Sequence, residues 1–98
     1  MAENRGVRAV VWEQIASLAE KYDVHQVILF GSRARGDYRE RSDIDLAVSG
    51  GNTAAFALDV DELTDTLLRF DIVDLDGRVQ PELLESIRRE GVVMYEKV

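Results

Sequence analysis

The sequence predicts an α/β (α+β) fold: a small mixed β-sheet of about four strands with helices packed on one face. Apolar residues recur at helical spacing in three segments, and short apolar runs rich in β-branched residues alternate with these segments. Turn-forming residues separate most of them. The 98 residues are 46% hydrophobic and 32% charged, which is a globular composition. We therefore expect one domain over residues 1–98.

The first half of the chain predicts a helix followed by two strands. Apolar residues between Val7 and Tyr22 recur three and four positions apart, which predicts an amphipathic helix. The apolar run 24–30 predicts a buried strand that ends at Gly31. The remaining elements of this half are a helical turn, a polar loop and a second strand, at residues 32–36, 37–42 and 43–49.

The second half predicts two helices that alternate with two strands. Thr53 begins a helix after a glycine-rich break, and one face of it is expected to carry Phe56, Val60, Leu63 and Leu67. Pro81 suits the first position of another helix, which runs to about Glu90. Gly91 is expected in the left-handed conformation that ends many helices. The two strands are expected at residues 70–75 and 92–95.

Composition excludes several kinds of site and partner. The chain has no cysteine, so disulfides, thiolate chemistry and cysteine zinc sites are absent. The net charge of -7 argues against a nucleic-acid surface, which needs a basic face. No apolar run approaches the roughly eighteen residues of a membrane span, and the first six residues have no apolar signal core. We expect a cytoplasmic protein without a membrane partner.

Two carboxylates at alternate positions predict a metal site. Asp43 and Asp45 flank Ile44, so strand alternation places both carboxylates on one face and Ile44 on the other. A cation between the carboxylates relieves their repulsion, and such oxygen ligands suit Mg²⁺ or Mn²⁺. A solvent-facing strand edge that carries two acids is the alternative interpretation.

A Gly-Ser pair precedes the two acids by a ten-residue spacer. Gly31 allows backbone N–H groups to approach an anion closely, and the Ser32 hydroxyl adds a directed donor. A helical turn that begins there adds partial positive charge. Arg33 and Arg35 lie where they could neutralise a triphosphate, with a solvated loop as the alternative. These residues predict a nucleotide-phosphate site.

Metal-dependent phosphoryl transfer commonly uses a further carboxylate. The third predicted strand offers Asp71, Asp74 and Asp76. Burial of Phe70 and Ile72 would turn Asp71 to the open face. We therefore favour Asp71 over Asp74 and interpret Asp76 as a turn residue.

These motifs together resemble the signature of the DNA polymerase β-like nucleotidyltransferase superfamily. The run from Gly31 to Tyr38 resembles most closely its minimal members, the MntA-type antitoxins of prokaryotes. The resemblance implies a polymerase β-like fold and metal-dependent transfer of a nucleoside monophosphate, AMP from ATP, with pyrophosphate leaving. It implies that three acids bind metal and catalyse and that two residues hold the β- and γ-phosphates: Asp43, Asp45 and Asp71, and Gly31 and Ser32.

The resemblance also implies a protein partner. Minimal members of the family are commonly encoded beside a small helical HEPN toxin, and adenylylation of a tyrosine on that toxin makes them antitoxins. A non-catalytic antitoxin that neutralises its partner by occlusion is one alternative, and a small-molecule nucleotidyltransferase is another. A homodimer through the helix that carries Trp12 also stays open.

Overall fold

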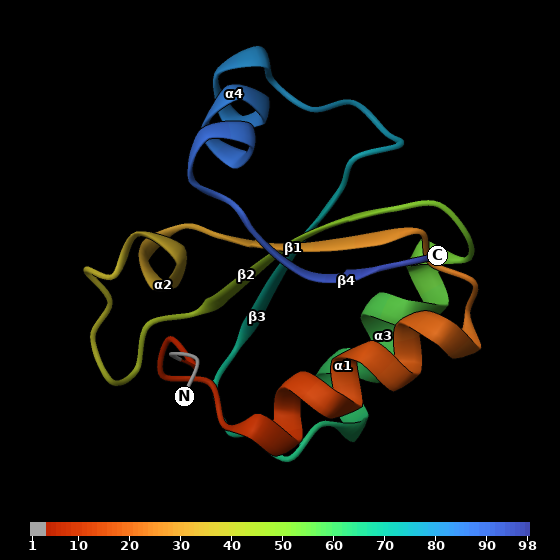
Figure 1. Ribbon diagram of the computed structural model, residues 1–98, viewed down its shortest axis with the longest axis horizontal. Helices are drawn as coiled ribbons and strands as arrows, with labels where there is room; N and C mark the ends of the chain where they lie inside the picture. Colours follow the sequence, from red (N-terminus) through yellow and green to blue (C-terminus); the bar gives the residue numbers. More distant parts are fainter. Residues whose placement is uncertain (1–3) are drawn as a thin grey trace.

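The computed structural model describes residues 4–98, which form four helices and a four-stranded sheet (Figure 1). In chain order the elements are α1 (Ala9–Lys21), β1 (Gln26–Phe30), α2 (Ser32–Arg35), β2 (Ile44–Ser49), α3 (Thr53–Leu63), β3 (Phe70–Asp74), α4 (Pro81–Glu90) and β4 (Val92–Glu96). The strand order is β3-β2-β1-β4. Strand β1 is antiparallel to both β2 and β4, whereas β2 and β3 are parallel and α3 connects them. This mixed sheet confirms the predicted fold class.

The larger core lies between one face of the sheet and helices α1 and α3, which run side by side beneath it (Figure 1). Alternate residues of β1 and β2 point into this core and are almost fully buried: Val27, Leu29, Ile44, Leu46 and Val48. The helices contribute the apolar faces that their periodicity predicted, with Val11, Ile15 and Ala19 from α1 and Phe56 and Val60 from α3. Trp12 is half-buried against the same core, and its indole N–H donates to the Asn4 carbonyl at 3.1 Å.

Helix α4 lies over the other face of the sheet, so helices cover both faces and not one (Figure 1). Its buried Ile87 packs on Phe30 and Ala47, which form a second, smaller apolar cluster. Pro81 begins the helix, and Arg88 and Arg89 lie in its last turn, where positive charge favours the helix dipole. Strand β1 is apolar at consecutive positions, so Ile28 and Phe30 face this cluster while Val27 and Leu29 face the larger core.

Helix α3 ends at Leu63, one turn earlier than its apolar periodicity predicted. The Thr64 hydroxyl donates to the Val60 carbonyl at 2.7 Å and closes the helix. The next residue is tied to α1, because the Asp65 N–H donates to the Gln14 side chain at 2.8 Å. Leu63 is more than half exposed and Leu67 is fully exposed, so the prediction that both lie on the buried face is wrong.

Gly91 does not adopt the predicted left-handed conformation. Its φ and ψ of -64° and 146° are extended, and the chain passes directly from α4 into β4. A Cβ atom here would collide with the Ile87 carbonyl and with the Ile28 side chain. The glycine is therefore needed for close packing between α4 and β1. Within residues 4–98, no helix has the length and apolar character needed to cross a bilayer.

Two substitutions on α3 test the assignment of its buried face. Phe56 is fully buried, whereas Leu58 is 58% exposed on the same helix. Phe56→Ala is expected to lower the free energy of unfolding by about 3–5 kcal/mol, because it removes buried apolar surface and leaves a cavity. Leu58→Ala is expected to change it by less than about 0.5 kcal/mol. Urea denaturation followed by circular dichroism measures both, and similar losses for the two variants would contradict this packing.

Candidate active site

Gly31, Asp45 and Asp71 lie in a row across three neighbouring strands. We call the Gly31 backbone, where the chain turns after β1, the glycine cradle. In the antiparallel pair, Phe30 of β1 lies opposite Asp45 of β2. In the parallel pair, Asp45 lies beside Asp71 of β3. Registered neighbours in a sheet present their side chains on the same face. The structure therefore brings Asp71 alongside Asp45, on the face of the sheet that also carries α4.

Gly31 turns the chain from β1 into α2 directly against the Asp45 carboxylate. Its φ of 75° and ψ of -154° favour glycine, and a Cβ atom would collide with the carboxylate oxygen. Ser32, the first residue of α2, is half-buried. The first N–H groups of a helix have no partner within the helix, so unpaired backbone donors begin at Ser32, next to the Asp45 carboxylate. The backbone and the acid form one continuous polar surface.

Burial and neighbouring acids raise the pKa of Asp45 to about 6. Partial burial is the largest cause, and the negative charges of Asp71 and Asp43 add to it. Arg35 and Arg33 act in the opposite direction, without cancelling the effect. Asp71 and Asp43 therefore both lie close enough to the Asp45 carboxylate to repel it. This repulsion is the local condition that a cation relieves.

The donor chemistry fits a divalent cation that also binds phosphates. Among residues 4–98, no group of three or more His, Cys, Asp or Glu side chains is placed to hold a metal ion by itself. Mg²⁺ does not require one, because it is commonly held by one or two carboxylates together with substrate phosphates and water. Asp45 is half-buried with its carboxylate against Gly31, and Asp43 is exposed immediately before β2, close enough to raise the pKa of Asp45. The residues present suit Mg²⁺ or Mn²⁺ bound together with a nucleotide.

The other two acids of the third strand have structural partners at its far end. Asp74 accepts a hydrogen bond from the Thr53 hydroxyl at 3.1 Å and one from the Asp76 N–H at 2.9 Å. Asp76 accepts from the Gly50 N–H at 2.7 Å, which connects the turn after β3 to the loop after β2. Neither carboxylate lies in register with Asp45, so the structure distinguishes Asp71 from Asp74 by position.

Arg33 differs from its predicted placement, because its side chain points into the protein. Only 1% of Arg33 is exposed. Its guanidinium donates to the Ser42 carbonyl at 2.8 Å and to the carbonyls of Arg5 and Glu40 at 3.2 Å each, and it lies 4.9 Å from the centre of the Tyr38 ring. Backbone carbonyls thus use the donors that a triphosphate was expected to use. In this structure Arg33 organises the loop between α2 and β2.

Arg35 lies on the surface between α2 and α4. Its guanidinium forms ion pairs with Asp37 at 3.2 Å and with Glu90 at 3.1 Å, and both carboxylates raise the pKa of Arg35. It also adds positive charge close to Asp45. Glu90, the last residue of α4, was not singled out in the sequence analysis, because nothing in its local pattern indicates a partner 55 residues away.

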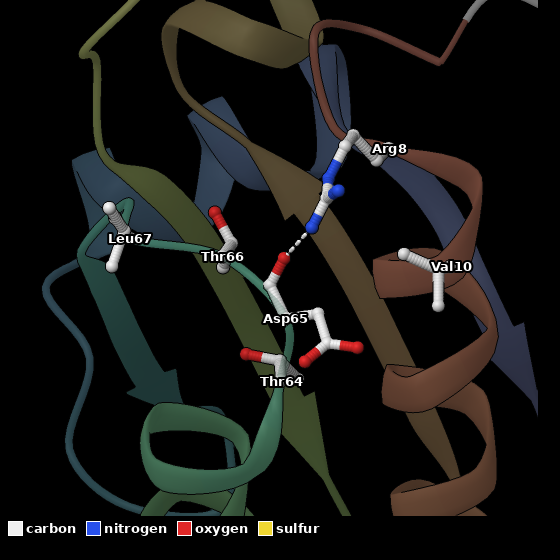
Figure 2. Close-up of a pocket in the computed structure, with 6 residues that line it drawn as sticks. All are labelled: Arg8, Val10, Thr64, Asp65, Thr66 and Leu67. Atoms are coloured by element: carbon white, nitrogen blue, oxygen red, sulfur yellow. Dashed lines mark hydrogen bonds between the residues drawn. The ribbon is translucent and has the colours of Figure 1, made fainter.

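Two cavities lie on the side of the molecule where β2 and β3 begin. A cavity of about 480 Å³ is lined by residues that precede these strands: Glu40, Arg41, Asp43, Leu67, Leu68 and Arg69. A wider one, of about 660 Å³, lies between the start of α1 and the loop after α3, where the Arg8 guanidinium donates to the Asp65 carbonyl (Figure 2). Leu67 borders both cavities. The sequence analysis missed Arg69, although this cation lies two residues before Asp71.

A family model and a relative of known name both indicate a nucleotidyltransferase. A family model described as polymerase beta, nucleotidyltransferase matches residues 13–98. A protein of Methanocaldococcus jannaschii named "Putative protein adenylyltransferase MJ0604" is 34% identical, and the match covers 85% of this chain and 92% of that protein.

Solved structures share the fold. A structure described as a minimal nucleotidyltransferase is 34% identical, with a TM-score of 0.65, and the match covers 83% of this chain and 86% of the other. A toxin–antitoxin crystal structure with AMP-PNP has a TM-score of 0.68 at 24% identity, and the match covers 88% of this chain and 73% of the other. The second likeness shows a shared fold.

Replacement of Asp45 tests the repulsion among the acids. Because the pKa of Asp45 rises from 3.8 to about 6 on folding, the protonated carboxyl stabilises the native state below pH 3.8, and this contribution is lost as the pH rises through about 6. Asp45→Asn is therefore expected to raise the Tm in metal-free buffer at pH 8, with a gain that disappears near pH 4. Asp61→Asn, an exposed substitution on α3, controls for the loss of one charge. Equal gains at both pH values would contradict the pKa shift.

Replacement of Arg33 tests its structural position. Arg33→Ala is expected to lower the free energy of unfolding by about 2–4 kcal/mol, because it empties a buried volume and leaves several carbonyls without donors. Arg41→Ala, in the same loop but exposed, is expected to change it by less than about 0.5 kcal/mol. Chemical denaturation of the two variants measures the difference. An Arg33 variant of unchanged stability would show that its side chain is free to leave the carbonyls.

Proposed function

The chain belongs to the polymerase beta nucleotidyltransferase family, and we propose that it transfers AMP from ATP to a tyrosine hydroxyl of a HEPN-type toxin protein. Membership of the family makes it a nucleotidyltransferase. The choice of ATP, the acceptor, the metal and the role of each residue are the proposal. In this role the chain is a cytoplasmic antitoxin that inactivates its partner by covalent modification.

One observation carries the proposal. The backbone of Gly31, the carboxylate of Asp45 and the strand position of Asp71 follow one another across β1, β2 and β3. Backbone donors suited to an anion therefore lie next to carboxylates that repel the charge of Asp45. Nucleotidyl transfer needs this combination, because a negatively charged triphosphate must bind beside groups that activate a hydroxyl.

We assign the Gly31 end of the row to pyrophosphate, which is the leaving group. Gly31 and Ser32 hold the β- and γ-phosphates through backbone N–H groups and the serine hydroxyl. Arg35 lies on the surface close to Asp45 and adds positive charge there. Because these donors are fixed before ATP binds, they stabilise the charge that develops on the departing pyrophosphate without reorganisation.

The acids are assigned to the reacting side. Asp43, Asp45 and Asp71 would hold Mg²⁺ or Mn²⁺, which supplies positive charge for the α-phosphate and for the attacking oxygen. The acceptor oxygen forms a bond to the α-phosphorus, and the bond from this phosphorus to the oxygen that bridges to the β-phosphate breaks. Pyrophosphate leaves with that electron pair. Asp71 accepts the hydroxyl proton, since it lies beside Asp45 at the edge of the sheet.

Three findings support a protein acceptor. The relative from Methanocaldococcus jannaschii has a name that describes protein adenylylation. The fold is shared with a toxin–antitoxin complex that contains AMP-PNP. The net charge of -7 disfavours a nucleic-acid acceptor, whose phosphates would be repelled.

A label-transfer assay tests the proposal. The chain is mixed with Mg²⁺, ATP labelled at the α-phosphate and the HEPN protein encoded beside its gene, and label on that protein is measured. Asp43→Asn and Asp45→Asn are each expected to lower transfer by about 100-fold or more, because each removes a carboxylate from the metal site. Inhibition of the toxin without label, surviving in both variants, would show occlusion and not catalysis. Label on a small molecule alone would indicate a small-molecule nucleotidyltransferase.

A matched pair of variants separates the acids of β3. Asp71→Asn is expected to retain nucleotide binding while turnover falls, because the residue acts on the acceptor hydroxyl. Asp74→Asn is expected to retain turnover, since Asp74 is engaged with Thr53 and Asp76 away from the row. Turnover and the dissociation constant for ATP are measured for both. The reverse pattern would assign the catalytic role to Asp74.

A further inference from the structure

The cavity of about 480 Å³ adjoins one of the three acids directly, because Asp43 is part of its wall. One side of the cavity is the end of the α2–β2 loop, which contributes Glu40 and Arg41, and the other side is the segment before β3. The Ile44 N–H donates to the Arg69 carbonyl at 2.8 Å and fixes these two sides relative to each other. The cavity is thus a defined feature at the starts of β2 and β3.

The position of the cavity in the sheet relates it to the reaction. Strand β2 lies between β1 and β3, so the cradle that follows β1 and the cavity beside β3 lie on opposite sides of the β2 acids. In phosphoryl transfer the attacking and leaving oxygens are roughly in line on opposite sides of the phosphorus. If pyrophosphate leaves at Gly31 and Ser32, as the proposed function has it, the acceptor hydroxyl arrives from the side of the cavity.

The cavity carries two arginines without an acidic partner. Arg41 and Arg69 are exposed, and neither takes part in an ion pair within 4.0 Å among residues 4–98. Eight of the twelve Lys and Arg residues form no such pair, and these two differ from the others in that both line the cavity beside Asp43. Guanidinium groups bind carboxylates through paired, charge-assisted hydrogen bonds. They also offset the repulsion that an acidic acceptor would meet at Asp43.

An exposed leucine completes the surface. Leu67 is fully exposed, and it separates this cavity from the wider one that Arg8 and Val10 border (Figure 2). The neighbouring Leu68 is half-buried against the main core. An exposed apolar side chain beside a reacting site is suited to contact with an aromatic ring. The cavity wall therefore combines apolar contact with two guanidinium groups and with the carboxylates of Glu40 and Asp43.

We propose that the cavity between Arg41 and Arg69 binds the acceptor protein, and that it selects a tyrosine with an acidic residue close to it in sequence. The tyrosine ring contacts Leu67, its hydroxyl reaches the acids, and the neighbouring carboxylate binds the two guanidinium groups. This inference rests on the proposed function and adds the sequence preference of the acceptor. The same arginines could bind an anion from another source, the phosphates of ATP, and the experiment separates the two.

The probes are three short synthetic peptides that present one tyrosine flanked by Glu, by Gln or by Lys. Transfer of label from ATP labelled at the α-phosphate gives kcat/KM for each peptide. NMR titration of the protein, with Mg²⁺ and an ATP analogue carrying a methylene bridge between the α- and β-phosphates, reports which backbone amides each peptide perturbs. The Glu peptide is expected to be preferred over the Gln peptide by about 10- to 100-fold, the value of charge-assisted hydrogen bonds. Its perturbations are expected around Arg41, Leu67 and Arg69.

Variants distinguish the source of the anion. The double substitution Arg41→Ala/Arg69→Ala is expected to abolish the preference for Glu while the dissociation constant of the ATP analogue changes less than about twofold. Arg41→Lys/Arg69→Lys is expected to restore part of the preference. Arg78→Ala, which removes an exposed charge after the other end of β3, is the matched control for the arginine variants.

Each result decides a different claim. Equal binding and transfer of the Glu and Gln peptides, or perturbations away from the cavity, would overturn the acceptor assignment while leaving nucleotidyl transfer intact. Loss of affinity for the ATP analogue in the double variant would place the arginines in the nucleotide site, and it would also overturn the acceptor assignment. Absence of nucleotide binding and of any label transfer would instead contradict the proposed function. Circular dichroism confirms that each variant is folded.

Discussion

The passage of the Gly31 backbone across the Asp45 carboxylate constrains the rest of the site. The antiparallel register places Phe30 opposite Asp45, so the next residue must turn while it lies against an acid. A positive φ and the absence of a Cβ atom make this possible only for glycine. Helix α2 begins at the following residue, and its free N–H groups therefore start beside the carboxylate. The proposed phosphate site and the proposed metal site adjoin because Gly31 joins them.

The same constraint concentrates like charges. Asp45 cannot move away from Gly31 without a break in the sheet, and Asp71 is held beside it by the parallel register. Partial burial of Asp45 and the charges of its neighbours raise its pKa to about 6, which means that the ionised site opposes folding near neutral pH. The surrounding packing must offset this cost. Buried Arg33 in the α2–β2 loop and α4 over Phe30 supply such support close to the row.

Backbone geometry explains which parts of the fold could be predicted from sequence. Alternation along a strand put Asp45 on the face opposite Ile44, and the burial expected for Phe70 and Ile72 put Asp71 on the open face. The structure agrees with both placements, because both rules depend only on local geometry. The end of α3 could not be predicted in this way. Contacts from Arg8 and Gln14 fix the chain at Asp65, and such tertiary contacts override a continuing apolar period. The position of α4 and the conformation of Gly91 depend likewise on contacts with β1.

The arginines near the site show that a sequence motif does not predict the role of a long side chain. Arg33 and Arg35 are two residues apart, yet one is buried among carbonyls and the other pairs with Glu90 at the surface. A long, flexible side chain reaches partners in any direction, so its sequence position does not determine its role. An aspartate or a glycine has no such reach, and its role follows from the backbone. Residues fixed by the backbone therefore carry the motif on which the proposed reaction rests, whereas the role of a long side chain such as Arg41 or Arg69 follows only from its surroundings in the structure.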